Sequence, residues 1–135
     1  MTFKSTGSIH YEHNGLLNEY KMYVLVDPNI TNYYRTLTNK TCISNMVNKS
    51  RYPAHISVLR KETPANFDSW GRYNNQSISY EYDHYVYNDD VYWWLRVKCD
   101  KLCDIRMELG LDRHSMYSRP PDGVDFFHIT IGNTK

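Results

Sequence analysis

The stretch His55-Ile-Ser-Val-Leu-Arg60 decides the fold, and its apolar residues alternate with polar ones as they do in a half-buried β-strand. Side chains of a strand point alternately to its two faces, so His55 and Ser57 share one face, opposite the aliphatic residues. The same pattern recurs at His128-Ile-Thr-Ile131. We therefore expect two strands that each bury an aliphatic face and present an imidazole and a hydroxyl on the other.

The segments around these strands alternate between strand and helix patterns. An apolar run at 22–26 predicts a strand, and Asp27 followed by Pro28 suits the start of a helix. Asp100 and Gly110 suit the two ends of a second helix. The other expected elements are a helix over 28–38, irregular chain over 39–52, loops over 61–75 and 111–125, and strands over 77–87, 91–97 and 126–132. This order predicts an α+β fold with mainly antiparallel sheets, in a single domain of residues 1–135.

Composition limits the function classes. The chain has 135 residues and a net charge of +1, so no overall positive field recruits duplex DNA, although a local basic groove is compatible with that charge. An odd number of cysteines, Cys42, Cys99 and Cys103, predicts reduced core residues and a cytoplasmic protein. No apolar run approaches the ~20 residues of a membrane span, so no membrane partner is expected. The sequence offers no metal-binding constellation, and no cofactor is expected.

Two imidazoles and two hydroxyls around one small volume suit the cleavage of a phosphodiester. One histidine can take a proton from the attacking oxygen while the other gives a proton to the leaving oxygen, because the histidine pKa lies near neutrality. Hydroxyls can donate hydrogen bonds to the non-bridging phosphate oxygens. A single histidine in a strand is more often structural, so spacing alone leaves the catalytic and the structural interpretation open.

The paired HISV and HITI segments resemble the signatures of the 2H phosphoesterase superfamily, in which His is followed by a hydrophobic residue, Ser or Thr, and another hydrophobic residue. The resemblance covers residues 21–133. It implies a two-lobed fold with pseudo-twofold symmetry and a central cleft. It further implies that His55 and His128 are catalytic and that Ser57 and Thr130 bind phosphate. Members include LigT-like RNA phosphoesterases, cyclic phosphodiesterases, and phage nucleases that destroy the cyclic oligonucleotides of CBASS defence.

The chain departs from the family pattern in three respects. It ends soon after Asn133, so a strand that follows the second motif in the family is expected to come from elsewhere, such as residues 8–11. Ser57 stands where Thr is commoner, which is chemically equivalent. The two motifs are also farther apart than in the shortest members, so the intervening loops are particular to this chain.

Further residues are candidates for binding the substrate. Tyr23 occupies a position that resembles a base-stacking aromatic of the phage nucleases, although one of 13 tyrosines can equally be a core or surface residue. Trp70 is a second stacking candidate. Lys61 is preferred over Arg60 for phosphate, because strict alternation turns Arg60 away from His55. The remaining assignments are Arg119 as another phosphate contact, at least one of Trp93 and Trp94 in the core, and His10, His13, His84 and His114 at the surface.

The resemblance predicts a metal-independent phosphodiesterase that acts on a small nucleotide, a cyclic oligonucleotide or an RNA end. The Asn-, Tyr- and Lys-rich composition of the chain is compatible with an AT-rich phage genome. It favours a viral anti-defence nuclease in the host cytoplasm. The alternatives are an RNA-processing 2′,3′-cyclic or 2′-5′ phosphodiesterase, a non-catalytic nucleotide-binding or RNA-binding module, and a structural protein in which the twin motifs are coincidental. The sequence does not indicate the oligomeric state.

Overall fold

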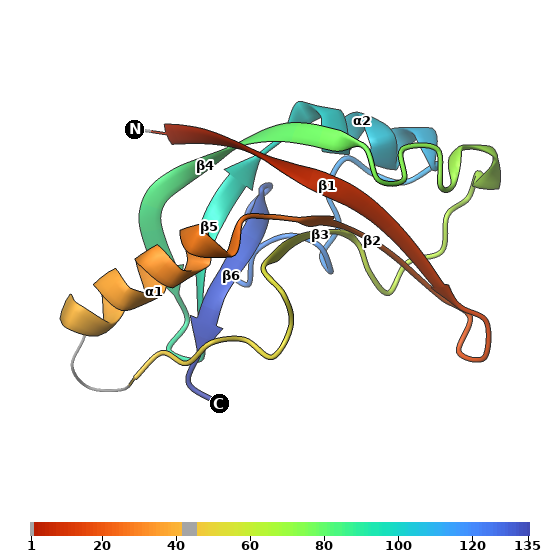
Figure 1. The fold of residues 1–135 in the computed structure, drawn as a ribbon. Coiled ribbons are helices and arrows are strands. Elements are labelled where there is room, and N and C mark those ends of the chain that lie inside the picture. The colour runs from red at the N-terminus through yellow and green to blue at the C-terminus, as the bar shows by residue number, and fades with distance from the viewer. Residues whose placement is uncertain (1, 42–45) are drawn as a thin grey trace.

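The computed structural model describes residues 2–41 and 46–135, which form strands and two α-helices (Figure 1). The elements in chain order are β1 (Thr2–Asn14), β2 (Glu19–Leu25), α1 (Pro28–Thr41), β3 (His55–Leu59), a 3-10 turn (Phe67–Ser69), β4 (Ser77–Asn88), β5 (Tyr92–Lys98), α2 (Asp100–Glu108) and β6 (Phe127–Asn133). The predicted α+β class is confirmed. Neither helix of the described part is long and apolar enough to cross a membrane.

The strands pair side by side in the order β1-β2-β3-β6-β5-β4, and β4 returns to β1 to close the ring. Every pair is antiparallel, as the sequence predicts. The order strand-strand-helix-strand occurs twice, first as β1-β2-α1-β3 and then as β4-β5-α2-β6. The two halves meet along β1 and β4 and again at β3 and β6, where Ile56 pairs with Ile129. The two histidine strands are therefore equivalent elements of the two halves.

Each helix packs against a strand of the other half. Helix α1 contacts β6, and α2 contacts β3. Figure 1 shows the two helices at opposite ends of the molecule. The core between them is supplied by alternate strand residues: Ile56, Val97 and Ile129 are fully buried in the cluster that includes α2. A second cluster joins α1 to β5 and β6 through Tyr34, Leu95 and Ile131. The two halves thus share their core.

Some elements differ from the expectation. Strand β1 runs over thirteen residues rather than the expected 8–11, because its first half pairs with β4 and its second half with β2. The register between β5 and β6 shifts between Trp93 and Trp94. Both indoles are buried, in agreement with the prediction that at least one of them lies in the core. Cys99 and Cys103 are free and buried, as predicted, whereas Cys42 lies outside the described residues.

The described segment that leads into β3, residues 46–54, is irregular as predicted apart from one bridge at Asn48, but it is anchored. The Asn39 side chain donates to the Val47 carbonyl at 2.9 Å and accepts from the Val47 N–H at 2.8 Å. Asn48 then forms a two-way backbone bridge with Asn133 of β6, at 2.7 and 3.0 Å. Gly132 permits this approach, because a Cβ there would overlap the Asn48 carbonyl oxygen. Helix α1 also extends to Thr41, past the predicted end at residue 38.

Candidate functional site

The pairing of β3 with β6 brings the two motifs together. Because Ile56 pairs with Ile129 and both are fully buried, the residues on either side of them point to the opposite face of the sheet. Antiparallel register sets Ser57 beside His128 and His55 beside Thr130. The four residues singled out by the sequence thus form a two-by-two array, hereafter called the quartet, with the histidines on its diagonal. All four are partly exposed.

The same face continues onto β2, where Tyr23 pairs with Ser57. The Tyr23 ring lies edge-on to the His55 ring, with 6.2 Å between centroids, and stacks on His10 at 5.6 Å. Its hydroxyl donates to the Glu12 carboxylate at 2.7 Å. Burial, and next the Glu12 carboxylate, raise the pKa of Tyr23 to about 12. Tyr23 therefore lies next to the quartet, and His10 is part of this aromatic group rather than an isolated surface residue.

His55 has a fixed tautomer when it is neutral. Its Nδ1 atom lies 2.8 Å from the Pro53 carbonyl oxygen. A carbonyl oxygen only accepts hydrogen bonds, so the proton resides on Nδ1 and Nε2 is left to exchange protons. The same hydrogen bond holds when the ring is fully protonated, because Nδ1 still donates. The Pro53 carbonyl therefore orients His55 for use in either protonation state.

His128 is in a different environment. Its Nδ1 atom is buried and has no hydrogen-bond partner among the described residues. Burial lowers the pKa of His128 to about 4, and the nearby positive charges of His55 and Arg60 contribute to the shift. The Ser118 backbone and the Asp122 carboxylate act in the opposite direction but do not outweigh burial. His128 is therefore neutral near pH 7, the protonation state that a general base requires.

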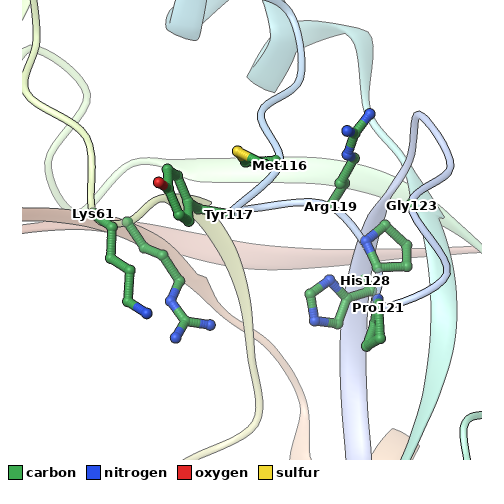
Figure 2. Close-up of a pocket in the computed structure, with 9 residues that line it drawn as sticks. Lys61, Met116, Tyr117, Arg119, Pro121, Gly123 and His128 are labelled. Atoms are coloured by element: carbon green, nitrogen blue, oxygen red, sulfur yellow. The ribbon is translucent and has the colours of Figure 1, made fainter.

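A pocket of about 400 Å³, hereafter pocket 1, opens beside His128. Figure 2 shows Lys61 on one side of it and His128 on the other, with Tyr117 between them. Its lining residues are Arg60, Lys61, Met116, Tyr117, Arg119, Pro120, Pro121, Gly123 and His128. Three of these are cations, and no described Asp or Glu lines the pocket. Such a pocket is suited to an anion.

Arg60 lines this pocket together with Lys61, contrary to the expectation from alternation. Strand β3 ends at Leu59, so alternation does not extend to Arg60. The backbone then turns at Lys61, whose φ of 57° lies in the left-handed region. This turn brings both cations to the pocket. Arg119 also lines it, but its guanidinium is paired with Asp125 at 3.2 Å.

A buried ion pair holds the walls of pocket 1. The Arg106 side chain of α2 is fully buried and donates to both carboxylate oxygens of Glu62, at 3.0 and 2.8 Å, and to the Val58 carbonyl at 2.8 Å. Ser115 also donates to Glu62, at 3.0 Å. Burial alone raises the pKa of Glu62, but Arg106 and Ser115 outweigh it and hold that pKa below its usual range. The network joins the turn after β3 to the loop that carries Tyr117.

A second pocket of about 440 Å³, hereafter pocket 2, lies on the other side of the quartet, beside Thr130. Its lining residues are Leu25, Val26, Pro28, Thr31, Arg35, Lys49, Ser50, Arg51, Tyr52, Pro53, Ala54, Thr130 and Ile131. It again contains three cations, and within the described ranges no carboxylate lines it. Arg35 is held by donating to the Ile131 carbonyl at 2.9 Å.

No family model, curated protein or solved structure matches this chain. Within residues 2–41 and 46–135, no three His, Cys, Asp or Glu side chains are grouped so that they could hold a metal ion.

Trp70 is not brought to the quartet. It packs edge-on against Tyr11 and Tyr20, with centroids 4.9 and 5.3 Å away, and lines neither pocket. His114, expected at the surface, is half-buried and lies 3.5 Å from the Cys103 sulfur, and burial lowers its pKa. In both cases a residue in an apparently polar loop is covered by residues distant in sequence.

Sequence reasoning missed the Arg106–Glu62 pair and the cations of pocket 2. Arg106 had a detectable signal, because it follows Leu102 by four residues and precedes Leu109 by three, which places it on the buried stripe of α2. An arginine on such a stripe predicts a buried partner. Lys49 and Arg51 had no comparable signal, since nothing periodic surrounds them.

Proposed function

We propose that this chain is a phosphodiesterase that uses His55 and His128 as a general acid–base pair, as the 2H resemblance implies. The observation that carries the proposal is the quartet itself: two histidines on a diagonal, each beside a hydroxyl, next to a cationic pocket that no described carboxylate lines. Such groups can bind a phosphodiester and move the protons of its cleavage.

The different surroundings of the two histidines favour different roles. His128, kept neutral by burial, takes the proton of the attacking hydroxyl. The attacking oxygen then forms its bond to phosphorus as the bond to the leaving oxygen breaks. His55, with Nδ1 held by the Pro53 carbonyl, gives the proton on Nε2 to the leaving oxygen. Ser57 and Thr130 donate hydrogen bonds to the non-bridging oxygens. Attack by a neighbouring 2′-hydroxyl would yield a 2′,3′-cyclic phosphate and a 5′-hydroxyl.

The arrangement of the chain supports the two-lobed form that the resemblance implies. In that form each lobe would correspond to one strand-strand-helix-strand half, and the cleft to the face that carries the quartet. The preferred substrate is a cyclic oligonucleotide with 3′-5′ bonds, which a viral nuclease would destroy in the host cytoplasm to block a defence signal. RNA processing of 2′,3′-cyclic or 2′-5′ bonds would use the same residues.

One observation favours a second candidate function, a non-catalytic nucleotide-binding or RNA-binding module. His55 and Ser57 line neither pocket, so the two pockets can bind anions without help from half of the quartet. In such a module His128 would be a neutral wall residue.

A substrate panel in excess EDTA tests the proposal and separates the two candidates. The panel contains 2′,3′-cyclic mononucleotides, 2′-5′ and 3′-5′ linear oligonucleotides and cyclic oligonucleotides, and chromatography identifies the products. We expect cleavage of at least one class in EDTA and none by the double variant His55→Ala/His128→Ala. Activity that EDTA removes and Mg²⁺ or Zn²⁺ restores would contradict the proposal. Binding without cleavage by the unmodified protein would identify the binding module.

A further inference from the structure

Pockets 1 and 2 share one equivalent part: each is lined by the segment that leads into a histidine strand. Pocket 1 combines the residues that follow β3, Arg60 and Lys61, with the loop that precedes β6, residues 116–123. Pocket 2 combines the segment that precedes β3, residues 49–54, with Thr130 and Ile131 of β6. One pocket therefore lies at each end of the quartet, beside His128 and beside Thr130.

Both pockets concentrate positive charge in a protein whose net charge is only +1. Three cations line each pocket, and the described carboxylates line neither. Lys49 and Arg51 of pocket 2, like Arg60 and Lys61 of pocket 1, form no ion pair with a described carboxylate. Cations gathered without counter-charges repel one another, so this arrangement is stabilised by an anionic ligand.

The backbone that carries two cations of pocket 2, Lys49 and Arg51, is held at both ends. The segment that carries Lys49 and Arg51 is fixed at its start by the Asn48–Asn133 bridge and at its end by the hydrogen bond of Val26 N–H to the Ala54 carbonyl, at 3.1 Å. The same segment supplies the Pro53 carbonyl that orients His55. One anchored segment therefore both lines pocket 2 and orients His55 of the proposed catalytic pair.

We propose that pocket 2 binds a second phosphate of the substrate and pocket 1 a third, on either side of the phosphodiester held at the quartet. The inference rests on the proposed function and narrows its substrate class. The substrate is an oligonucleotide with at least three successive phosphodiesters, in a linear or a cyclic chain, rather than a mononucleotide with a single 2′,3′-cyclic phosphate.

The test compares two substrates that differ in their number of phosphates. The dinucleotide ApA has one phosphodiester, and the tetranucleotide ApApApA has three. In the variant Lys49→Ala/Arg51→Ala, we expect the preference in kcat/KM for ApApApA over ApA to fall tenfold or more. The control variant Lys98→Ala/Lys101→Ala removes two exposed cations that line neither pocket and should keep the wild-type preference. An unchanged preference in Lys49→Ala/Arg51→Ala would overturn the inference.

Binding provides a readout that does not depend on catalysis. In the His55→Ala background, the affinity for ApApApA should fall with salt, with a log–log slope of about −2 for three phosphates, because each contact in a single strand contributes about −0.7. The variant Lys49→Ala/Arg51→Ala should lose about one phosphate contact, so its slope should be less negative by about 0.7. If the protein cleaves nothing but this loss is observed, the proposed function fails and the three-phosphate site remains. An unaltered slope would overturn the site even in an active enzyme.

Cyclic triadenylate, with three phosphodiesters in a ring, forms the third arm of the binding experiment. Tighter binding of the ring than of ApApApA would identify a cyclic substrate, and tighter binding of the linear chain would identify an RNA strand. If pocket 2 substitution weakens the binding of neither molecule, the inference is wrong.

Discussion

The two halves of the molecule carry the same motif on equivalent strands, yet they surround their histidines differently. His55 has a firm hydrogen-bond partner in the Pro53 carbonyl, whereas the buried Nδ1 of His128 has none among the described residues. In addition, burial lowers the pKa of His128 to about 4. The comparison teaches that a repeated fold supplies two similar side chains, while the loops before the strands give them different chemistry.

The largest expected effect comes from removing either histidine. His55→Ala and His128→Ala should each lower kcat/KM by on the order of 10²–10⁴-fold on an oligonucleotide, the usual contribution of a positioned acid or base. A substrate with a p-nitrophenolate leaving group does not need a general acid. It should therefore restore much of the rate in His55→Ala and little in His128→Ala.

The control is His13→Ala, which removes an exposed imidazole that stacks on Tyr20, a partly buried ring on the fringe of the core. Its rate should match that of the unmodified protein. The opposite pattern of rescue, with p-nitrophenolate restoring His128→Ala only, would reverse the roles assigned to the two histidines.

The next largest expected effect is a loss of stability on breaking the buried ion pair between Arg106 and Glu62. Arg106→Met should lower the free energy of unfolding by about 3–5 kcal/mol, because it leaves the Glu62 carboxylate buried without its partner. Urea denaturation measures this loss. Arg113→Ala is a matched control, since its ion pair with Asp100 is exposed, and an exposed pair contributes about 1 kcal/mol or less. Equal losses in both variants would show that the buried pair has no special role.

The smallest effect is a pH dependence of stability to which His128 contributes. The ordinary pKa of 6.5 applies to the unfolded chain, and burial lowers it to about 4 in the folded protein. Between these values the unfolded chain binds a proton that the folded protein does not. Stability should therefore fall as the pH drops from 6.5 towards 4, by at most about 1.4 kcal/mol per pH unit from this residue.

Urea denaturation at several pH values measures this dependence, and the variant His128→Asn should show a weaker dependence over the same range. A dependence that is unchanged in His128→Asn would assign the titration to another group. If His128 is also the base, the acidic limb of kcat/KM in the free enzyme should lie near pH 4 rather than near 6.5.

The sequence predicted what depends on neighbours along the chain. Alternation in β3 and β6 was enough to give the faces of His55 and His128, and the strand pattern around them gave the fold class. The rest depends on contacts between distant segments. Lys49 and Arg51 reach a pocket only because Asn48 pairs with Asn133, 85 residues later, and Trp70 is withdrawn from solvent by Tyr11 and Tyr20. No local period encodes such contacts.

The exchange of helices between the halves has a consequence for the ancestry of the fold. Since α1 covers β6 and α2 covers β3, one strand-strand-helix-strand unit by itself would leave apolar strand residues exposed to water. Two identical copies of such a unit could cover each other by symmetric exchange, and they would then place two copies of one histidine strand side by side. In that symmetric pair the two imidazoles would be chemically identical. A single chain with two unlike halves instead allows Pro53 to orient one histidine while burial holds the other neutral.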